Sequence, residues 1–270
     1  MTATQGGWFL QEHREAVSFQ QRFARSDDIA AVLAGQSDQA VRVDASGVGL
    51  GTLLELLMLK RGAPQAVTVA DTSNRGRLLR RLLRSSQPYL SEGARGVLHR
   101  RAGHESDDAT NDFANSFRTQ LVAAGVVTTA ALRLSGALHE LLTNVDEHAG
   151  DGVDGLGAFE VLGREAWMVV ADSGRGVLGG YQASPLADKP ADAEQALKWA
   201  VIDHRSRTGE PDRWTGFQTV MRSVRSLDGC VRVRSDGASL ELEQEADRSR
   251  FLLREQGKLR GFVVSVLLRW

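Results

Sequence analysis

The stretch Ala137–Gly150, A-L-H-E-L-L-T-N-V-D-E-H-A-G, carries the clearest pattern in the sequence. It contains no proline and no internal glycine, and its larger apolar residues recur at helical spacing, at Leu138, Leu141, Leu142 and Val145. This spacing predicts an amphipathic helix. Glu140, Asn144 and His148 lie four residues apart, so they stack along one flank of that helix. A carboxylate and a carboxamide one turn apart can take a proton and bind a divalent cation, although the same residues also suit an ordinary surface helix.

A second motif bears on the choice between these interpretations. Two strands are predicted over Ala158–Leu162 and Ala166–Ala171, and a short turn joins them as an antiparallel hairpin. Asp172 ends the second strand and is followed by Ser-Gly-Arg-Gly. Gly174 and Gly176 allow the backbone to turn sharply and to approach a ligand closely. Alone this is a common turn sequence, but here it follows the helix motif with a hairpin between, which favours a binding site.

The two motifs together resemble the nucleotide-binding motifs of the GHKL ATPase superfamily, and the branch that they resemble most is the anti-sigma-factor serine kinases. E-L-L-T-N followed by D-E-H-A is similar to the N box of that superfamily, and D-S-G-R-G is similar to its adenine-binding box. Their order and spacing agree with the superfamily, and the resemblance covers about residues 110–270. It implies a Bergerat-type α/β sandwich that binds ATP and Mg²⁺.

The resemblance also implies a role for each residue of the site. Glu140 would polarise the attacking water or acceptor hydroxyl, and Asn144 would bind the Mg²⁺ that bridges the phosphates. His148 matches the N-x-x-x-H-A ending of the helix motif, where it packs or contacts a phosphate. Asp172 would accept a hydrogen bond from the adenine amino group. Phosphoryl transfer needs mainly positioning and charge neutralisation, which one base and one metal ion can supply.

The segment 176–215 stands where the superfamily has its ATP lid, and one helix is predicted in it near Ala191–Asp203. Another helix is predicted over Gly216–Arg225, and Gly216 in its first turn suits a phosphate through free N–H groups. The family has a further glycine just before this one, and Trp214 replaces it here.

The N-terminal part alternates strands and helices, which predicts parallel strands. The predicted order is strand Ala40–Asp44, helix Thr52–Lys60, strand Ala66–Ala70 and helix Arg75–Arg84. One interpretation takes Gly47, Gly49 and Gly51 as a dinucleotide or S-adenosylmethionine turn, but about 110 residues are few for a doubly wound fold. The other rests on V-R-V-D-A-S-G-V, which resembles the V-x-L-D-L-S-G-V strand of STAS domains, the partners of anti-sigma kinases. The third interpretation is an α/β module with a purely structural role.

We therefore expect a STAS-like α/β module over residues 1–103, a polar linker over 104–112, and a GHKL-type domain over 113–270. The fold class is α/β for the first part and α+β, with one face of a sheet covered, for the second. The helix motif belongs to a long helix predicted over Thr128–His148, and further helices are predicted over 11–35 and Asp112–Ala123. Further strands are predicted over Cys230–Ser235, Ser239–Glu243 and Gly261–Leu268.

Composition narrows the range of partners. The 270 residues carry a net charge of −1 without a lysine- or arginine-rich run, so neither nucleic acid nor an anionic membrane is indicated. Cys230 is the only cysteine, and Thr143 occupies the second histidine position of a zincin motif, so zinc is not expected. The sequence shows no bilayer-spanning apolar run and no signal-peptide pattern, so we expect a cytoplasmic protein.

Three functions from different classes remain open. The first is a Mg-ATP-dependent ATPase or serine/threonine kinase that acts on a regulatory protein partner in partner switching. The second is an ATP-gated interaction switch with negligible turnover. The third is an S-adenosylmethionine-dependent methyltransferase built on the glycine turn. We expect the N-terminal module to serve for docking or for forming a homodimer, and not to accept phosphate on Ser46 or Thr52.

Overall fold

The computed structural model describes residues 19–35, 41–100, 107–148, 152–206, 215–245 and 248–270. Six strands form one antiparallel sheet: β3 (Tyr89–Glu92), β4 (Arg95–Arg100), β5 (Gly155–Leu162), β6 (Glu165–Asp172), β7 (Asp228–Glu245) and β8 (Arg248–Arg269). Their spatial order is β3-β4-β5-β6-β8-β7, so the last strand of the chain lies inside the sheet beside β6. Two shorter strands, β1 (Val41–Asp44) and β2 (Val67–Ala70), form a separate parallel pair. The chain is thus a mixed α and β protein, as the sequence predicts.

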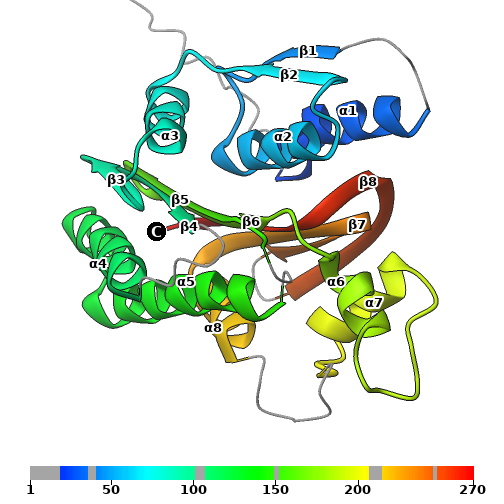
Figure 1. The fold of residues 1–270 in the computed structure, drawn as a ribbon. Helices are drawn as coiled ribbons and strands as arrows, with labels where there is room; N and C mark the ends of the chain where they lie inside the picture. Colours follow the sequence, from blue (N-terminus) through cyan, green and yellow to red (C-terminus); the bar gives the residue numbers. More distant parts are fainter. Residues whose placement is uncertain (1–18, 36–40, 101–106, 149–151, 207–214, 246–247) are drawn as a thin grey trace, which may run out of the picture.

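The β-α-β-α order predicted near the N-terminus is confirmed. A short 3₁₀ helix, η1 (Gln20–Phe23), and α1 (Ala24–Ala34) precede β1, α2 (Leu50–Gly62) connects β1 to β2, and α3 (Asn74–Arg84) follows. Residues 11–18 of the helix predicted over 11–35 lie outside the described residues. The apolar side chains of α2 are almost all buried, because this helix lies between the β1–β2 pair and the large sheet (Figure 1).

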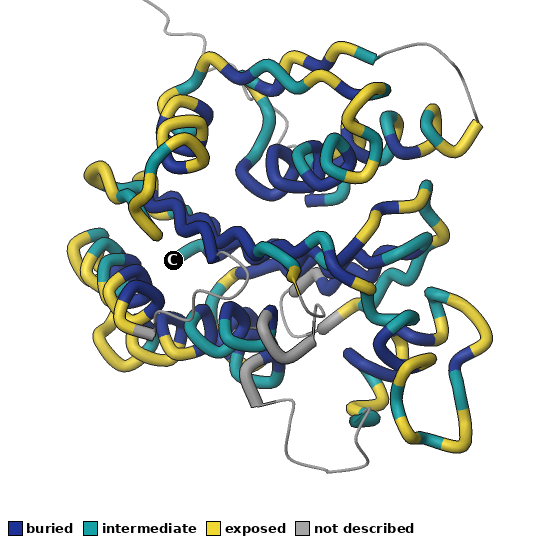
Figure 2. The backbone as a smooth tube through the Cα atoms, viewed as in Figure 1, coloured by how far each residue is buried: buried dark blue, intermediate teal, exposed yellow. Residues whose placement is uncertain are grey.

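Helices cover the large sheet on both faces (Figures 1 and 2). Those of the C-terminal part lie on one face, as expected, whereas the covering of the other face by the N-terminal helices was not predicted. The helices α4 (Asp107–Ala123), α5 (Thr128–His148) and α8 (Thr215–Ser226) pack on one face, and α1, α2 and α3 pack on the other. Val170 of β6 joins the core beneath α5, whereas its neighbour Val169 joins the core beneath α2. A strand that is buried on both faces has a continuous apolar sequence, which is why A-W-M-V-V-A in β6 does not alternate.

Strands β3 and β4 were not predicted, and they tie the N-terminal part of the chain to the large sheet. β4 pairs with β5 along its whole length, from Arg95 opposite Glu160 to Arg100 opposite Gly155. Helix α4 begins at Asp107, inside the range 104–112 expected to be a linker. The division of the chain near residue 103 remains a prediction, but the hydrogen bonds of the sheet cross it.

The other predicted helices and the β5–β6 hairpin are found close to their expected bounds, and two short helices, α6 (Gly176–Gln182) and α7 (Ala193–Val201), occupy the segment after β6. The two strands expected over Cys230–Ser235 and Ser239–Glu243 are one strand, β7, with a pairing irregularity at Ser235–Ala238. Asp236 at this irregularity has a left-handed φ of 53°. An Asp-Gly pair is a turn signal, but here the chain continues through it as a bulged strand.

A buried cluster of charges joins α1 and α2 to β7. Arg232 Nε lies 2.8 Å from Glu55 Oε1, and Arg234 Nη1 lies 2.8 Å from Glu55 Oε2. Asp27 of α1 contacts both arginines, and Glu241 contacts Arg232. Burial alone would raise the pKa of Glu55, but the two arginines hold it below its usual value. Each guanidinium therefore has carboxylates in place of the water that burial removes.

No helix within the described ranges is both long enough and apolar enough to cross a membrane.

Candidate functional site

The helix motif forms the second half of α5, and its apolar stripe faces the sheet. Leu138, Leu142 and Val145 are buried, as their spacing predicts. Glu140 and Asn144 are half-buried at the border of this stripe, one helical turn apart. The helix continues to His148, whose side chain lies outside the described residues. Both side chains are therefore partly exposed and are held on a rigid element.

Asp172 is the last residue of β6 and lies on the same face of the sheet as α5. Alternate residues of a strand share a face, and Met168 and Val170 of β6 both join the core beneath α5. The Asp172 side chain is buried, with 6% of its surface exposed. Its cross-strand partner on β8 is Phe262, which packs against the same core.

Packing brings the last turns of α5 to the end of the sheet that carries Asp172. Gly155 pairs with Asp172 across the β5–β6 hairpin. A Cβ atom added to Gly155 would lie only 2.8 Å from Cγ1 of Val145, the residue after Asn144. The helix therefore approaches the strand closely at this point, and glycine is required there. Asn144 and Asp172 are 28 residues apart in the sequence (172 minus 144). In the fold they lie on the same face of the sheet and near the same end of it.

The Asp172 carboxylate is unusually hard to ionise. Burial raises its pKa from 3.8 to about 6, the hydrogen bond from the Gly174 amide opposes this, and the nearby Asp236 carboxylate adds to it. The Gly174 nitrogen donates to Asp172 Oδ1 over 2.8 Å. Within the described part of the chain Oδ2 has no such donor, so one oxygen is free to accept a hydrogen bond from a ligand.

The turn after Asp172 is held by groups from the β7–β8 hairpin. Gly176 has a φ of +69°, and a Cβ there would lie 2.6 Å from Asp236 Oδ2 and 2.8 Å from Ser235 Oγ. Ser235 Oγ accepts a hydrogen bond from the Val177 amide, and Asp236 Oδ2 accepts one from Leu178. These side chains cap α6, so its N-terminus is already satisfied without a phosphate.

Gly261 of β8 crosses the backbone of Asp172 in close contact. Its φ is +94°, and a Cβ would lie 2.0 Å from the carbonyl oxygen of Asp172. The sequence predicted a strand from this glycine but gave no sign of the contact. Asp236 was also missed as a site residue, and its only signal in the sequence is the Asp-Gly pair that follows the strand predicted over Cys230–Ser235.

The other predicted residues are placed as follows. Gly216 lies in the first turn of α8, and α8 packs against α5. The expected lid contains α6 and α7, while its last part, residues 207–214 with Trp214, lies outside the described residues. The described residues hold no cluster of three or more histidine, cysteine or acidic groups that could enclose a metal ion. Mg²⁺ in nucleotide sites commonly keeps only one or two protein ligands and takes the rest from phosphates and water, which is the arrangement that Asn144 would serve.

The glycine turn near the N-terminus packs against the large sheet. A Cβ at Gly49 would touch the Trp167 ring at 3.4 Å, and a Cβ at Gly51 would lie 2.7 Å from Ser265 Oγ. Thr52 is fully buried and donates from Oγ1 to the Arg22 carbonyl oxygen. Two of the three glycines thus have a packing reason that involves no ligand.

No protein-family model matches the sequence, and no curated protein matches it.

Proposed function

We propose that the protein is a Mg-ATP-binding regulatory protein of GHKL type, with its nucleotide between the second half of α5 and the turn after Asp172. The observation that carries this proposal is the buried Asp172 carboxylate with one unpaired oxygen, on the same face and at the same end of the sheet as Asn144. This oxygen is not among the side-chain atoms that are fully enclosed without a partner, so a ligand can reach it. The exocyclic amino group of adenine is a donor of the right kind.

Each residue then has a task. Asp172 accepts from the adenine amino group, and the turn at Gly174–Gly176 lets the backbone lie close to the base. Asn144 offers its carboxamide oxygen to Mg²⁺, which supplies positive charge to the phosphates when bound. Glu140 lies one turn earlier on the same flank of α5, where it orients and deprotonates a water or hydroxyl. Gly216 and the first turn of α8 contribute N–H groups to the phosphates.

The N-terminal part fits docking better than phosphate acceptance. In the STAS-like interpretation, the turn after β1 would carry the acceptor hydroxyl. Thr52 is buried and hydrogen-bonded, and Ser46 Oγ lies 3.0 Å from Thr72 Oγ1. Both hydroxyls are hydrogen-bonded within the chain, which argues against phosphate acceptance at this turn.

The methyltransferase alternative has one observation in its favour. A cavity of about 260 Å³ lies beneath the glycine turn and is lined by Gly47, Gly49, Arg75 and Trp167 among others. However, Asp71, the acid that would bind a ribose after the second strand, is buried beside Arg75, and its Oδ1 accepts from the Ser73 amide. Its Oδ2 has no hydrogen-bond partner within the described residues, but it lies against Gly76 of α3, where an added Cβ would be only 2.6 Å away. We therefore keep ATP as the proposed ligand.

Isothermal titration with ATP, in the presence and absence of Mg²⁺, tests the proposal. Asp172→Ala should weaken ATP binding by about tenfold to a hundredfold, because the amino group loses its acceptor. Asn144→Ala should abolish the effect of Mg²⁺ on the affinity. Asp108→Ala, an exposed acid at the start of α4, is the matched control and should bind as the wild type does. Equal ATP affinity in all four proteins, or no binding in any, would exclude this site.

A further inference from the structure

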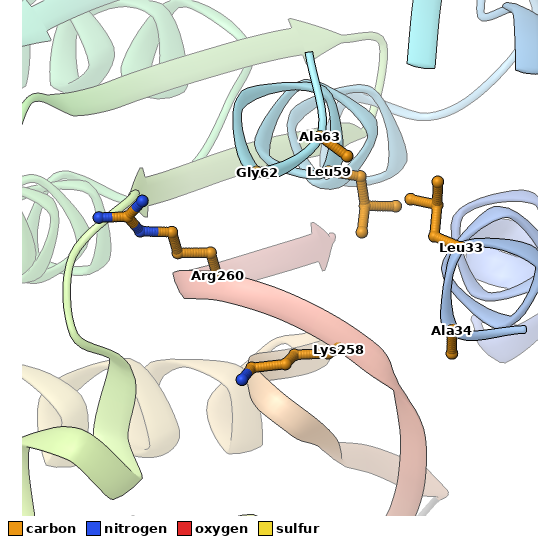
Figure 3. Close-up of a pocket in the computed structure, with 7 residues that line it drawn as sticks. All are labelled: Leu33, Ala34, Leu59, Gly62, Ala63, Lys258 and Arg260. Atoms are coloured by element: carbon orange, nitrogen blue, oxygen red, sulfur yellow. The ribbon is translucent and has the colours of Figure 1, made fainter. Parts of the chain in front are cut away.

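A second cavity, of about 250 Å³, opens between α1, α2 and β8 (Figure 3). Its lining combines apolar residues of the two helices with two cations of the strand: Leu33, Ala34, Leu59, Gly62, Ala63, Lys258 and Arg260. In Figure 3 Leu33 and Leu59 point towards each other, and Lys258 and Arg260 extend from β8 on one side of them. None of these residues belongs to the proposed nucleotide site.

The apolar part of this cavity is open to solvent. Leu59 is buried, but Leu33 is only partly covered and Ala34 at the end of α1 is exposed. Helix α1 packs so tightly on β8 that a Cβ at Gly257 would lie 2.3 Å from the backbone of Ala30. The helix therefore cannot move inward to close the opening, and the apolar surface remains accessible to another molecule.

The charges that line the cavity are of one sign. Among the described residues that line the cavity, the two charged ones are both cations and none is acidic. Lys258 is close enough to Asp236 to lower the pKa of that carboxyl group, which burial otherwise raises. Arg260 has no ion-pair partner anywhere in the described ranges of the chain. An occupant that joins an apolar group to carboxylates would complement both parts.

The volume favours part of a large partner over a whole small molecule. Pockets that enclose a drug-sized ligand measure roughly 300–1,000 Å³. This cavity is smaller and open, so it can hold one or two apolar side chains while the rest of the occupant stays outside. A peptide segment in which apolar and acidic residues are neighbours has this form.

We infer that this cavity, defined by Leu33, Leu59, Lys258 and Arg260, is a docking site for an acidic, apolar segment of a partner protein. The segment places an apolar side chain between α1 and α2 and its carboxylates on the two cations of β8. This docking does not depend on nucleotide, because none of its residues is proposed to contact ATP.

Selection from a phage-displayed library of random dodecapeptides, against the full-length protein without nucleotide, tests this inference. The enriched peptides should share a large apolar residue flanked by aspartate or glutamate. A fluorescein-labelled copy of the best peptide is then titrated by fluorescence anisotropy. Lys258→Gln and Arg260→Gln should each weaken its binding by about two- to fivefold, and raised salt should weaken it further.

Two more variants make the result specific to the cavity. Ala34→Glu adds a carboxylate at an exposed position in the lining and should abolish peptide binding without affecting the fold. Arg164→Gln removes an exposed charge at the turn between β5 and β6 and should bind as the wild type does. Failure to enrich acidic peptides, or equal binding by Ala34→Glu, would refute the inference. Light scattering that shows a dimer in the wild type and a monomer in Ala34→Glu would also refute it, because the occupant would then be a second copy of this chain.

Discussion

Burial of the Asp172 carboxylate makes the stability of the folded protein depend on pH. Its pKa is about 6 in the folded chain and 3.8 without the fold, so the folded state binds the proton more tightly. The corresponding stability is fully present below pH 3.8 and is lost as the pH rises through about 6. Above that pH the ionised group opposes folding by up to about 3 kcal/mol.

Asp172→Asn should therefore stabilise the free protein at high pH. The amide keeps the size and an acceptor for the Gly174 nitrogen but carries no charge. We expect a higher melting temperature than the wild type at pH 8 and little difference at pH 4, as measured by thermal unfolding followed by circular dichroism. The same shift at both pH values would mean that ionisation of Asp172 is not the cause.

Glu140→Gln separates binding from chemistry. The substitution preserves side-chain length and helix propensity in α5, so ATP affinity should stay within about twofold. Any ATP turnover should fall by roughly a hundredfold or more, because glutamine cannot take a proton. Steady-state phosphate release measures this, and Glu194→Gln at the start of α7 is a control on a neighbouring helix. Turnover that is equally low in the wild type would favour an ATP-gated switch.

The site residues that could be predicted from the sequence are those that belong to a local motif. Glu140 and Asn144 could be placed together because helical spacing alone sets their relation. Asp236 and Gly261 could not, because they meet Asp172 only through the pairing of β8 with both β6 and β7. A long-range contact of this kind leaves no periodic signal in the sequence.

The buried charges of β7 are neutralised mainly by residues that are distant in the chain. Arg232 and Arg234 are fully buried, and their carboxylates come from α1, α2 and β7 itself. A buried ion pair is weak evidence for stability, but removing one member leaves an uncompensated charge. The cluster therefore makes the position of α1 and α2 on the sheet highly specific.

Arg232→Met should destabilise the protein by about 3–5 kcal/mol, because Glu55 then loses its principal counter-charge. Urea unfolding measures the change. Arg81→Gln breaks the exposed pair with Glu92 and should cost less than about 1 kcal/mol. In the double variant Arg232→Met with Glu55→Gln, we expect a cost smaller than the sum of the single ones. A purely additive cost would contradict direct coupling.

The elements found by sequence were those with a long or regular apolar pattern. Helix α5 was predicted with its observed bounds, because its stripe continues over the whole helix. Strands β3 and β4 were missed because neither Y-L-S-E nor R-G-V-L-H-R alternates apolar and polar residues. The pairing of β4 with β5, and not an intrinsic preference, holds them in the sheet.

For the whole molecule, the shared sheet predicts that the C-terminal part does not fold alone. A fragment of residues 104–270 would lack α1–α3 and β4, and would expose the sheet residues Trp167, Val169 and Val263 to water. We expect it to bind the dye ANS and to unfold without a cooperative transition. Co-expression of residues 1–100 should restore cooperative unfolding. A fragment that melts cooperatively by itself would show instead that residue 103 divides two independent domains.

The covering of both faces could not be deduced from the sequence. The apolar helix α2 was recognised, but its partner strands β6 and β8 begin more than a hundred residues later. Local patterns show that a surface is apolar and leave open what covers it. The candidate site was accessible to prediction because two local motifs define it, whereas the arrangement of the layers required the structure.

The charge cluster also sets an order of events during synthesis. Glu55 finds its arginine 177 residues further along the chain. At roughly 5–20 residues per second, the ribosome needs roughly 10 to 35 s to make that stretch. For that time the leucine-rich α2 has neither its counter-charge nor its partner strand β8, so the newborn chain is most exposed to proteases and to aggregation in its first third. A premature stop after Leu227, just before β7, would leave every chain permanently in that condition.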